Sequence, residues 1–186
     1  MEQVDSGAHS KLEVFFITML QEMYWSETHL LSVLATMRDE ATTDTLKECF
    51  STHRHQTNNH IQRLDEVFHL LQLSPEPKPC IGLQGIFDEG WQVIDETESG
   101  TAQRDVALII AAQKVEHYEM ACYGSLAQLA RTLDKEELAG LLEDTLEEEK
   151  DADSLLTDIA EEGINYQASK EPVATSENTI YPENNQ

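Results

Sequence analysis

Apolar residues recur at helical spacing along most of the chain. From Leu12 to Met37 they fall alternately three and four residues apart, which is typical of a helix with one buried face. The same spacing predicts further long helices over residues 44–72, 102–132 and 134–163. No segment shows the two-residue alternation of a convincing strand. The pattern therefore predicts an all-α protein.

Local signals predict where these helices begin and end. Three prolines in residues 74–79 end the second long helix, because proline removes an amide donor and disfavours the helical conformation of the residue before it. A shorter apolar segment over residues 80–97 predicts one small helix, which Gly100 ends. Asp134 and Glu137 have the spacing of a capping box, which predicts the start of the last long helix at Asp134.

The lengths of the connections predict the topology. Short turns around Ala41 and Leu133 indicate two antiparallel helix pairs. Roughly thirty residues separate the pairs, enough to cross a helix of ~40 Å at about 1.5 Å per residue. Two antiparallel hairpins joined by a long crossover that carries a short extra helix form a ferritin-like four-helix bundle. We assign this domain to residues 11–164 and predict disorder for the polar segments 1–10 and 165–186.

Composition narrows the classes of function. The 186 residues include 12 Lys and Arg against 36 Asp and Glu, a net charge of −24. This charge repels phosphate backbones and anionic lipids, so we expect no nucleic-acid partner and no membrane partner. The chain has no apolar run long enough to span a membrane and no signal-peptide pattern at its start. Its three cysteines are widely spaced and fit reduced thiols, so we predict a cytoplasmic protein.

Acidic and imidazole residues interrupt the apolar stripes of all four long helices. A carboxylate that points into a bundle costs several kcal/mol unless a cation or hydrogen bonds compensate it. In an antiparallel hairpin, residues equidistant from the turn lie at the same depth: Glu119 mirrors Glu149, and Glu27 mirrors a position between His53 and Gln56. The interrupting residues are Glu27, then His53, Gln56 and His60, then Glu116 and Glu119, and last Glu149 and Asp153.

Carboxylates and imidazoles that converge from four helices are the ligands of dinuclear iron or manganese sites. Taken singly, each residue also fits an ordinary role, such as a solvated glutamate or a hydrogen-bonded histidine, and most of the acidic run at 147–153 must face water. The mirrored arrangement favours the metal site. The predicted ligands are Glu27, His53, Glu116, Glu119, Glu149 and Asp153, supported by Tyr24, Gln56 and His60.

Four segments resemble the YciE/YciF-like family of bacterial ferritin-like proteins, and the resemblance covers residues 11–164. They are MYWSETHL (23–30), HRHQTNNHIQRL (53–64), RDVALIIAAQKVEHYEMACYG (104–124) and TLEEEKDAD (145–153). The resemblance implies a rubrerythrin-like bundle, a homodimer, a dinuclear metal centre and a link to stress responses. By position it makes ligands of Glu27, His53, Glu116, Glu119 and Glu149.

The chain also departs from this family pattern. Relatives usually carry glutamate where Gln84 stands and an acidic residue near Asn58, and helix two here has no carboxylate in its polar gap. A complete ligand set would then need Glu89 or Asp153 as a substitute.

The sequence is compatible with three functions. The first is a dinuclear iron or manganese protein that oxidises Fe(II) with dioxygen or peroxide, in a ferroxidase- or peroxidase-like reaction with an external electron donor. Here Glu119 or Glu149 bridges the ions, while Glu27, Glu116 and His53 are terminal ligands. The second is a metal-free structural or interaction bundle. The third, a redox thiol at Cys122, is disfavoured because its neighbours are apolar or acidic.

Overall fold

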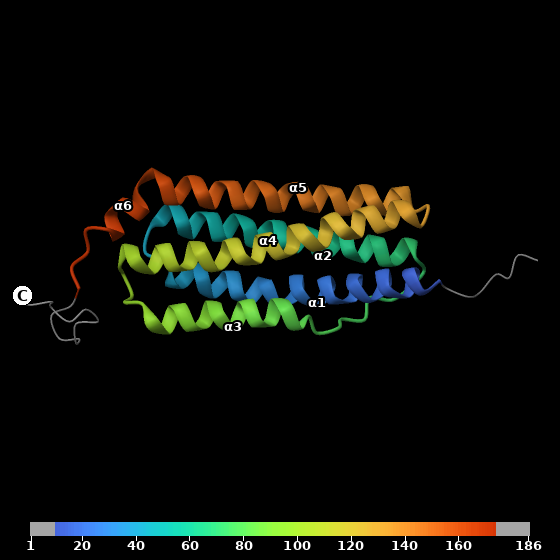
Figure 1. Cartoon of the computed structure of the whole chain (residues 1–186), viewed down its shortest axis with the longest axis horizontal. Helices are drawn as coiled ribbons and strands as arrows, with labels where there is room; N and C mark the ends of the chain where they lie inside the picture. The colour runs from blue at the N-terminus through green and yellow to red at the C-terminus, as the bar shows by residue number, and fades with distance from the viewer. Residues whose placement is uncertain (1–9, 174–186) are drawn as a thin grey trace, which may run out of the picture.

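The computed structural model describes residues 10–173, and all regular structure in this range is helical. Four long helices lie side by side along their length (Figure 1). A shorter helix, α3 (Ile81–Glu96), packs on the outside against α4 and α1. The all-α prediction is confirmed. The long helices are α1 (Lys11–Glu40), α2 (Asp44–Leu70), α4 (Ala102–Thr132) and α5 (Glu136–Ile159).

The order and direction of the helices follow the predicted connections. Helix α2 returns antiparallel to α1, and α5 returns antiparallel to α4 (Figure 1). The linker between the two hairpins carries α3 back along the bundle, so that α4 starts beside the α1–α2 turn. The amide of Lys78 donates to the carbonyl of Gln21 at 3.1 Å, which holds the linker against α1.

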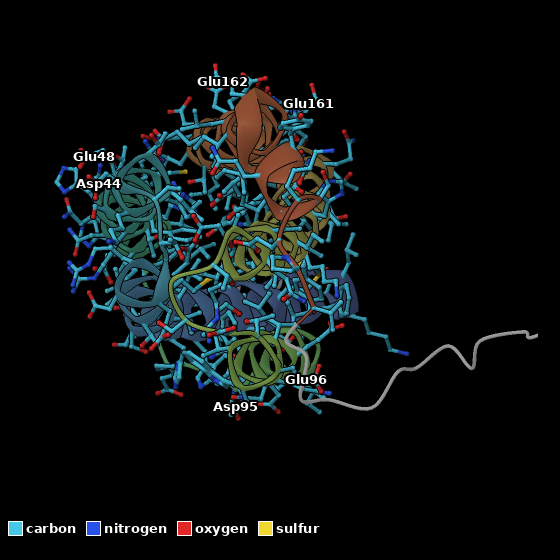
Figure 2. All side chains as sticks on the ribbon, turned by 90° about the vertical axis from the view of Figure 1, so that its left-hand side faces the viewer. Asp44, Glu48, Asp95, Glu96, Glu161 and Glu162 are labelled. Carbon is cyan, nitrogen blue, oxygen red and sulfur yellow. The ribbon has the colours of Figure 1, made fainter. Side chains whose placement is uncertain are left out.

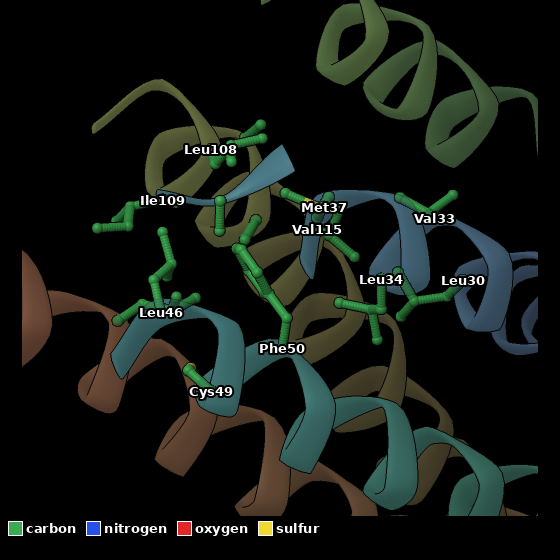
Figure 3. Packing of buried hydrophobic residues seen from close by; sticks show 14 of the residues in the cluster. Leu30, Val33, Leu34, Met37, Leu46, Cys49, Phe50, Leu108, Ile109 and Val115 are labelled. Atoms are coloured by element: carbon green, nitrogen blue, oxygen red, sulfur yellow. The ribbon is translucent and has the colours of Figure 1, made fainter. Parts of the chain in front are cut away.

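The apolar core consists of two clusters, one toward each end of the bundle. The first lies toward the α1–α2 turn, and Figure 3 shows side chains of α1, α2 and α4 meeting there, among them Leu34, Phe50 and Val115. The second, toward the α4–α5 turn, includes Phe16 and Leu138. Fully burying one such large side chain contributes about 1.5–3 kcal/mol. The two clusters hold the four helices together at both ends of the bundle, and the buried acidic and imidazole residues lie between them.

The turn between α4 and α5 differs from the predicted capping box. Asp134 has a φ of 57°, and α5 begins at Glu136 without a side-chain cap. The amide of Lys135 donates to the carbonyl of Ala130 at 2.9 Å, and that of Asp134 donates to Arg131 at 3.0 Å. These two bonds close the end of α4 in a Schellman-type motif. The capping-box prediction is wrong because this position must adopt the left-handed conformation, which aspartate tolerates.

The C-terminal boundary also differs from the prediction. The helical path continues through residues 160–164 into α6 (Asn165–Ala168). Glu171 then accepts hydrogen bonds from the amides of Ala102 at 2.6 Å and Gln103 at 2.9 Å, which caps the start of α4. The prediction of disorder from residue 165 is therefore wrong for residues 165–171. At the other end, Ser10 caps α1 by accepting from the amide of Glu13. Residues 1–9 and 174–186 lie outside the described range.

The acidic surplus lies on the outside of the bundle. Figure 2, an end-on view, shows labelled acidic side chains of α2, of α3 and of the segment 160–164 that follows α5 pointing away from the helices. Among residues 10–173, no helix combines the length and the apolar character that a membrane span requires.

Helix α2 is capped by a residue of another helix. Its own N-cap, Thr43, makes no side-chain capping bond. Instead the carboxylate of Asp105, fully buried on α4, accepts from the amides of Thr42 at 2.6 Å and Thr43 at 2.9 Å. Asp105 thus joins the first hairpin to the second.

We expect Asp105→Ala to lower the free energy of unfolding by about 1–2 kcal/mol, because two amide donors at a helix start lose their acceptor. Urea denaturation in the presence of a chelator measures this change. Asp95→Ala, at an exposed position on α3 (Figure 2), is the matched control and should stay within about 0.5 kcal/mol of the native chain. Equal midpoints for all three proteins would contradict a capping role for Asp105.

Candidate metal centre

Six ionisable side chains from the four long helices meet between the two apolar clusters. Each of these six residues is at most 4% exposed as a whole. They form two groups whose potential ligand atoms lie within 4.8 Å of one another, and Glu149 belongs to both. The first group is His53, Glu116, Glu119 and Glu149, and the second is Glu27, His60 and Glu149.

Glu149 lies between the two imidazoles. Its Oε1 is 3.0 Å from His60 Nδ1, and its Oε2 is 3.8 Å from His53 Nε2. His53 Nε2 also lies 3.4 Å from Glu116 Oε1, and His60 Nδ1 lies 3.4 Å from Glu27 Oε1. Of the two residues predicted for a bridging position, Glu149 therefore presents one oxygen to each group.

Most of the ligand-type atoms in this centre have no hydrogen-bond partner. Within residues 10–173, ten buried side-chain nitrogen or oxygen atoms lack one, and all but Thr43 Oγ1 belong to the six residues. Both oxygens of Glu119 and both of Glu149 are among them. Buried polar groups normally have hydrogen-bond partners, so a cluster of unsatisfied ones calls for a bound ion or another compensating group. The donor set, four carboxylates and two imidazoles, fits iron or manganese.

Helix periodicity explains how α2 supplies two imidazoles. His53 and His60 are seven residues apart, which is two turns, so they share one face of the helix. Thr57 lies between them, and its hydroxyl donates back to the carbonyl of His53 at 3.0 Å. On α4, Glu116 and Glu119 are three residues apart and likewise share a face.

A carboxylate outside the cluster orients His60. The Nε2 atom of His60 donates to Glu148 Oε2 at 2.9 Å, so its Nδ1 points into the centre. Arg63 binds both oxygens of Glu148, with Nη1 3.1 Å from Oε2 and Nη2 on Oε1. A carboxylate on the outer nitrogen fixes the ring and raises its basicity, as at many histidine metal ligands. Neither Glu148 nor Arg63 was predicted from the sequence to belong to the centre.

Tyr123 is a further residue of the centre that sequence reasoning missed. It is fully buried, and its hydroxyl donates a hydrogen bond to Glu27 Oε1. This leaves Glu27 Oε2 without a partner. Tyr123 follows Glu119 by four residues and so shares its helix face, which was the available signal.

When no cation is bound, the electrostatics favour the neutral form of two of the four carboxyl groups in the centre. Burial, reinforced by neighbouring carboxylates, raises the pKa of Glu116 and of Glu119 well above the usual value. Burial opposes a charge on His60, but Glu27 and Glu149 outweigh it and raise the His60 pKa to about 11. Burial likewise opposes a charge on Glu149, yet the imidazole of His60, 3.0 Å from its Oε1, lowers the Glu149 pKa. These shifts favour the neutral form of Glu116 and Glu119 and the charged form of His60 beside Glu149.

Several predicted residues lie elsewhere. The structure does not bring Asp153 to the centre: its Oδ1 lies 3.2 Å from Gln113 Nε2 and 3.3 Å from His117 Nε2, near the surface. Glu89, the other suggested substitute, pairs with Lys114 at 2.6 Å. His60, predicted as a supporting residue, lies within the cluster.

The remaining two predicted supporting residues, Tyr24 and Gln56, are not placed against the ligand-type atoms. Tyr24 packs edge-on against Phe68, and burial together with a hydrogen bond to Asp65 raises its pKa. Gln56 is partly exposed on α2. At Cys122, burial raises the thiol pKa to about 11, which disfavours the thiolate that redox chemistry would need.

Fold and centre together define an all-helical bundle protein with a buried layer of glutamates and histidines. The chain belongs to the family described as Domain of unknown function (DUF892), which matches residues 11–169. It is 40% identical to protein YciF of Escherichia coli K12 over 158 residues. These residues are 84% of this chain and 95% of that protein. The predicted resemblance to YciF-like proteins is confirmed.

Solved structures agree with this assignment. The crystal structure of the E. coli stress protein YciF matches with a TM-score of 0.80 at 39% identity, over 84% of this chain and 99% of that one. YcfI from Rhodopseudomonas palustris matches with a TM-score of 0.76 at 29% identity, over 84% and 98%. A protein from Xanthomonas campestris, with a TM-score of 0.66 at 20% identity over 86% and 98%, shares the fold.

Proposed function

We propose that this chain is a dinuclear non-haem metal protein of the stress response, with its long helices in the ferritin-like arrangement. The observation that carries the proposal is the cluster of nine unsatisfied buried ligand-type atoms contributed by four helices. Iron is the first choice of metal and manganese the second. The proposed ligands are Glu27, His53, His60, Glu116, Glu119 and Glu149.

The composition of the cluster supports two divalent ions. Four ionised carboxylates would balance the charge of two such ions, and oxygen with imidazole nitrogen suits iron and manganese. Each group supplies one imidazole, and Glu149 supplies an oxygen to both. A charge balance of this kind offsets the cost of burying several carboxylates together.

Bound iron would supply one-electron redox steps, so that Fe(II) is oxidised by dioxygen or peroxide. The protein's own residues bury the site from water, hold Glu27 through Tyr123 and orient His60 through Glu148. The sequence contains no paired CxxC motifs, so a peroxidase cycle would need an external electron donor. A cytoplasmic homodimer is part of the proposal, and the description of the E. coli relative as a stress protein supports the stress assignment.

Metal content tests the proposal directly. Protein loaded anaerobically with Fe(II), desalted and analysed for its elements should contain two iron ions per chain. Glu119→Gln should contain fewer, and Glu48→Gln, at an exposed position on α2 (Figure 2), should match the native protein. Native protein that carries no iron or manganese after loading would refute the proposal.

The second candidate is a metal-free structural or interaction bundle. The 3.0 Å contact between His60 and Glu149, together with protonated Glu116 and Glu119, would partly compensate an empty centre. The Rhodopseudomonas relative is itself described as a proposed structural protein. The two candidates predict opposite consequences of metal removal, which a Glu119 variant separates.

A further inference from the structure

We propose that the two halves of this centre are unequal: one retains its cation, and the other exchanges its cation with solvent past Glu148 and Arg63. The retaining half-site is the four-residue group His53, Glu116, Glu119 and Glu149. The exchanging half-site is the three-residue group Glu27, His60 and Glu149. This inference rests on the proposed function and adds which residues set retention and access.

The ligand sets of the two half-sites differ in number and charge. The retaining half-site has three carboxylates and one imidazole, whereas the exchanging half-site has two carboxylates and one imidazole, with Glu149 common to both. In addition, one oxygen of Glu27 already accepts the hydroxyl proton of Tyr123. Affinity for a divalent cation rises with the number of charged oxygen ligands. The retaining half-site should therefore bind its ion more tightly.

The half-sites also differ in their connection to solvent. His60 contacts Glu148, whose side chain is 30% exposed, and Glu148 contacts Arg63, which is 23% exposed. On the other side, the side chain of His53 is 5% exposed and that of Glu116 is 1% exposed. Among the side chains of residues 10–173 with a polar contact to the six residues, Glu148 is the one that reaches solvent.

The contacts of Glu148 describe a route for an ion. Arg63 occupies both oxygens of Glu148, so an incoming cation must first displace this guanidinium. A cation held by Glu148 is then next to His60 and to Glu149, the neighbouring residue on α5. The guanidinium controls this route because it binds both oxygens of Glu148 at once. A lysine would make only a point contact there.

Retention is tested with Mn(II) on the full chain. Saturated protein should hold two ions per chain and keep one after dialysis against metal-free buffer, with dissociation constants at least about tenfold apart. Glu27→Gln should lower the saturated content to one ion and leave the retained ion in place. Glu116→Gln should lose the retained ion, and Glu119→Gln serves in its place if that variant fails to fold by circular dichroism.

Access is tested by the rate at which the labile ion leaves. Arg63→Lys keeps the charge but not the two-pronged contact, so release of one ion into chelator should become several-fold faster while the saturated content is unchanged. Arg54→Lys, at an exposed position of the same helix, is the matched control and should release at the native rate. Equal release rates for all three proteins would overturn the route past Arg63.

The possible results distinguish the unequal half-sites from the proposed dinuclear function. Two ions that leave the native protein together, with equal affinity, would overturn the unequal half-sites and leave the dinuclear function standing. Protein that binds no Mn(II) or Fe(II) at saturation would overturn the proposed function itself.

Discussion

Glu119→Leu should stabilise the metal-free protein and remove most of the stability that metal loading confers. Both oxygens of Glu119 are buried without a hydrogen-bond partner, and burial raises its pKa. Leucine of similar size removes this unsatisfied group, worth about 1–3 kcal/mol. For a chain of this length, each kcal/mol moves the melting temperature by about 2–4 °C. Thermal unfolding with chelator and with added metal measures both effects.

The control for this experiment is Glu161→Leu, at an exposed position near the end of α5 (Figure 2). It should change the stability by no more than about 0.5 kcal/mol in either condition. A destabilised Glu119→Leu protein in chelator would contradict an uncompensated carboxyl at this position. A variant that metal stabilises as strongly as the native chain would show that Glu119 is not a ligand.

The metal-free protein should lose stability as the pH rises from 5 to 9. Glu116 and Glu119 have raised pKa values in the folded state, whereas unfolded glutamates titrate near ~4.3. Their contribution is complete below that pH and is lost as the pH rises, because the unfolded state releases its protons first. His60, with a pKa of about 11 against the usual 6.5, acts in the same direction above ~6.5. Glu149, whose pKa is lowered, loses its contribution only as the pH falls toward the folded value, so it does not reverse the trend.

Metal should reverse this pH dependence. A cation binds the deprotonated carboxylates and the neutral imidazole, so its affinity rises with pH and binding releases protons. At a free metal concentration of about 100 times Kd, each site adds roughly 2.7 kcal/mol. Urea midpoints at pH 5, 7 and 9, with chelator and with Mn(II), should therefore diverge as the pH rises. Parallel profiles, or no proton release in an unbuffered titration, would contradict this coupling.

The helices and the depth of the polar layer could be predicted from the sequence because both depend on regular geometry. A constant rise per residue puts Glu119 and Glu149 at one level on either side of their turn, and the structure places both in one group. Spacing along the helix does not decide which partner a side chain meets. Asp153 lies one turn, about 6 Å, beyond Glu149 along α5. At that level it meets Gln113 and His117 instead of the centre.

Other parts of the centre depend on packing between helices that are distant in sequence. Glu148 is one of several acidic residues in a row, and only the packing of α5 against α2 brings it to His60. Tyr123 occupies a position on the apolar stripe of α4, and only its hydrogen bond to Glu27 makes it part of the centre. The position of Glu171 on the start of α4 likewise requires the whole tertiary fold.

The caps that Asp105 and Glu171 provide make folding a collective property of the chain. The first turn of α2 is completed by a side chain of α4, and the first turn of α4 by a residue beyond α6. A fragment that ends in the linker after α2 would keep its hairpin but leave the amides of Thr42 and Thr43 without the buried carboxylate. Each hairpin thus depends on residues outside it to cap a helix, so the intact chain should unfold in a single cooperative step.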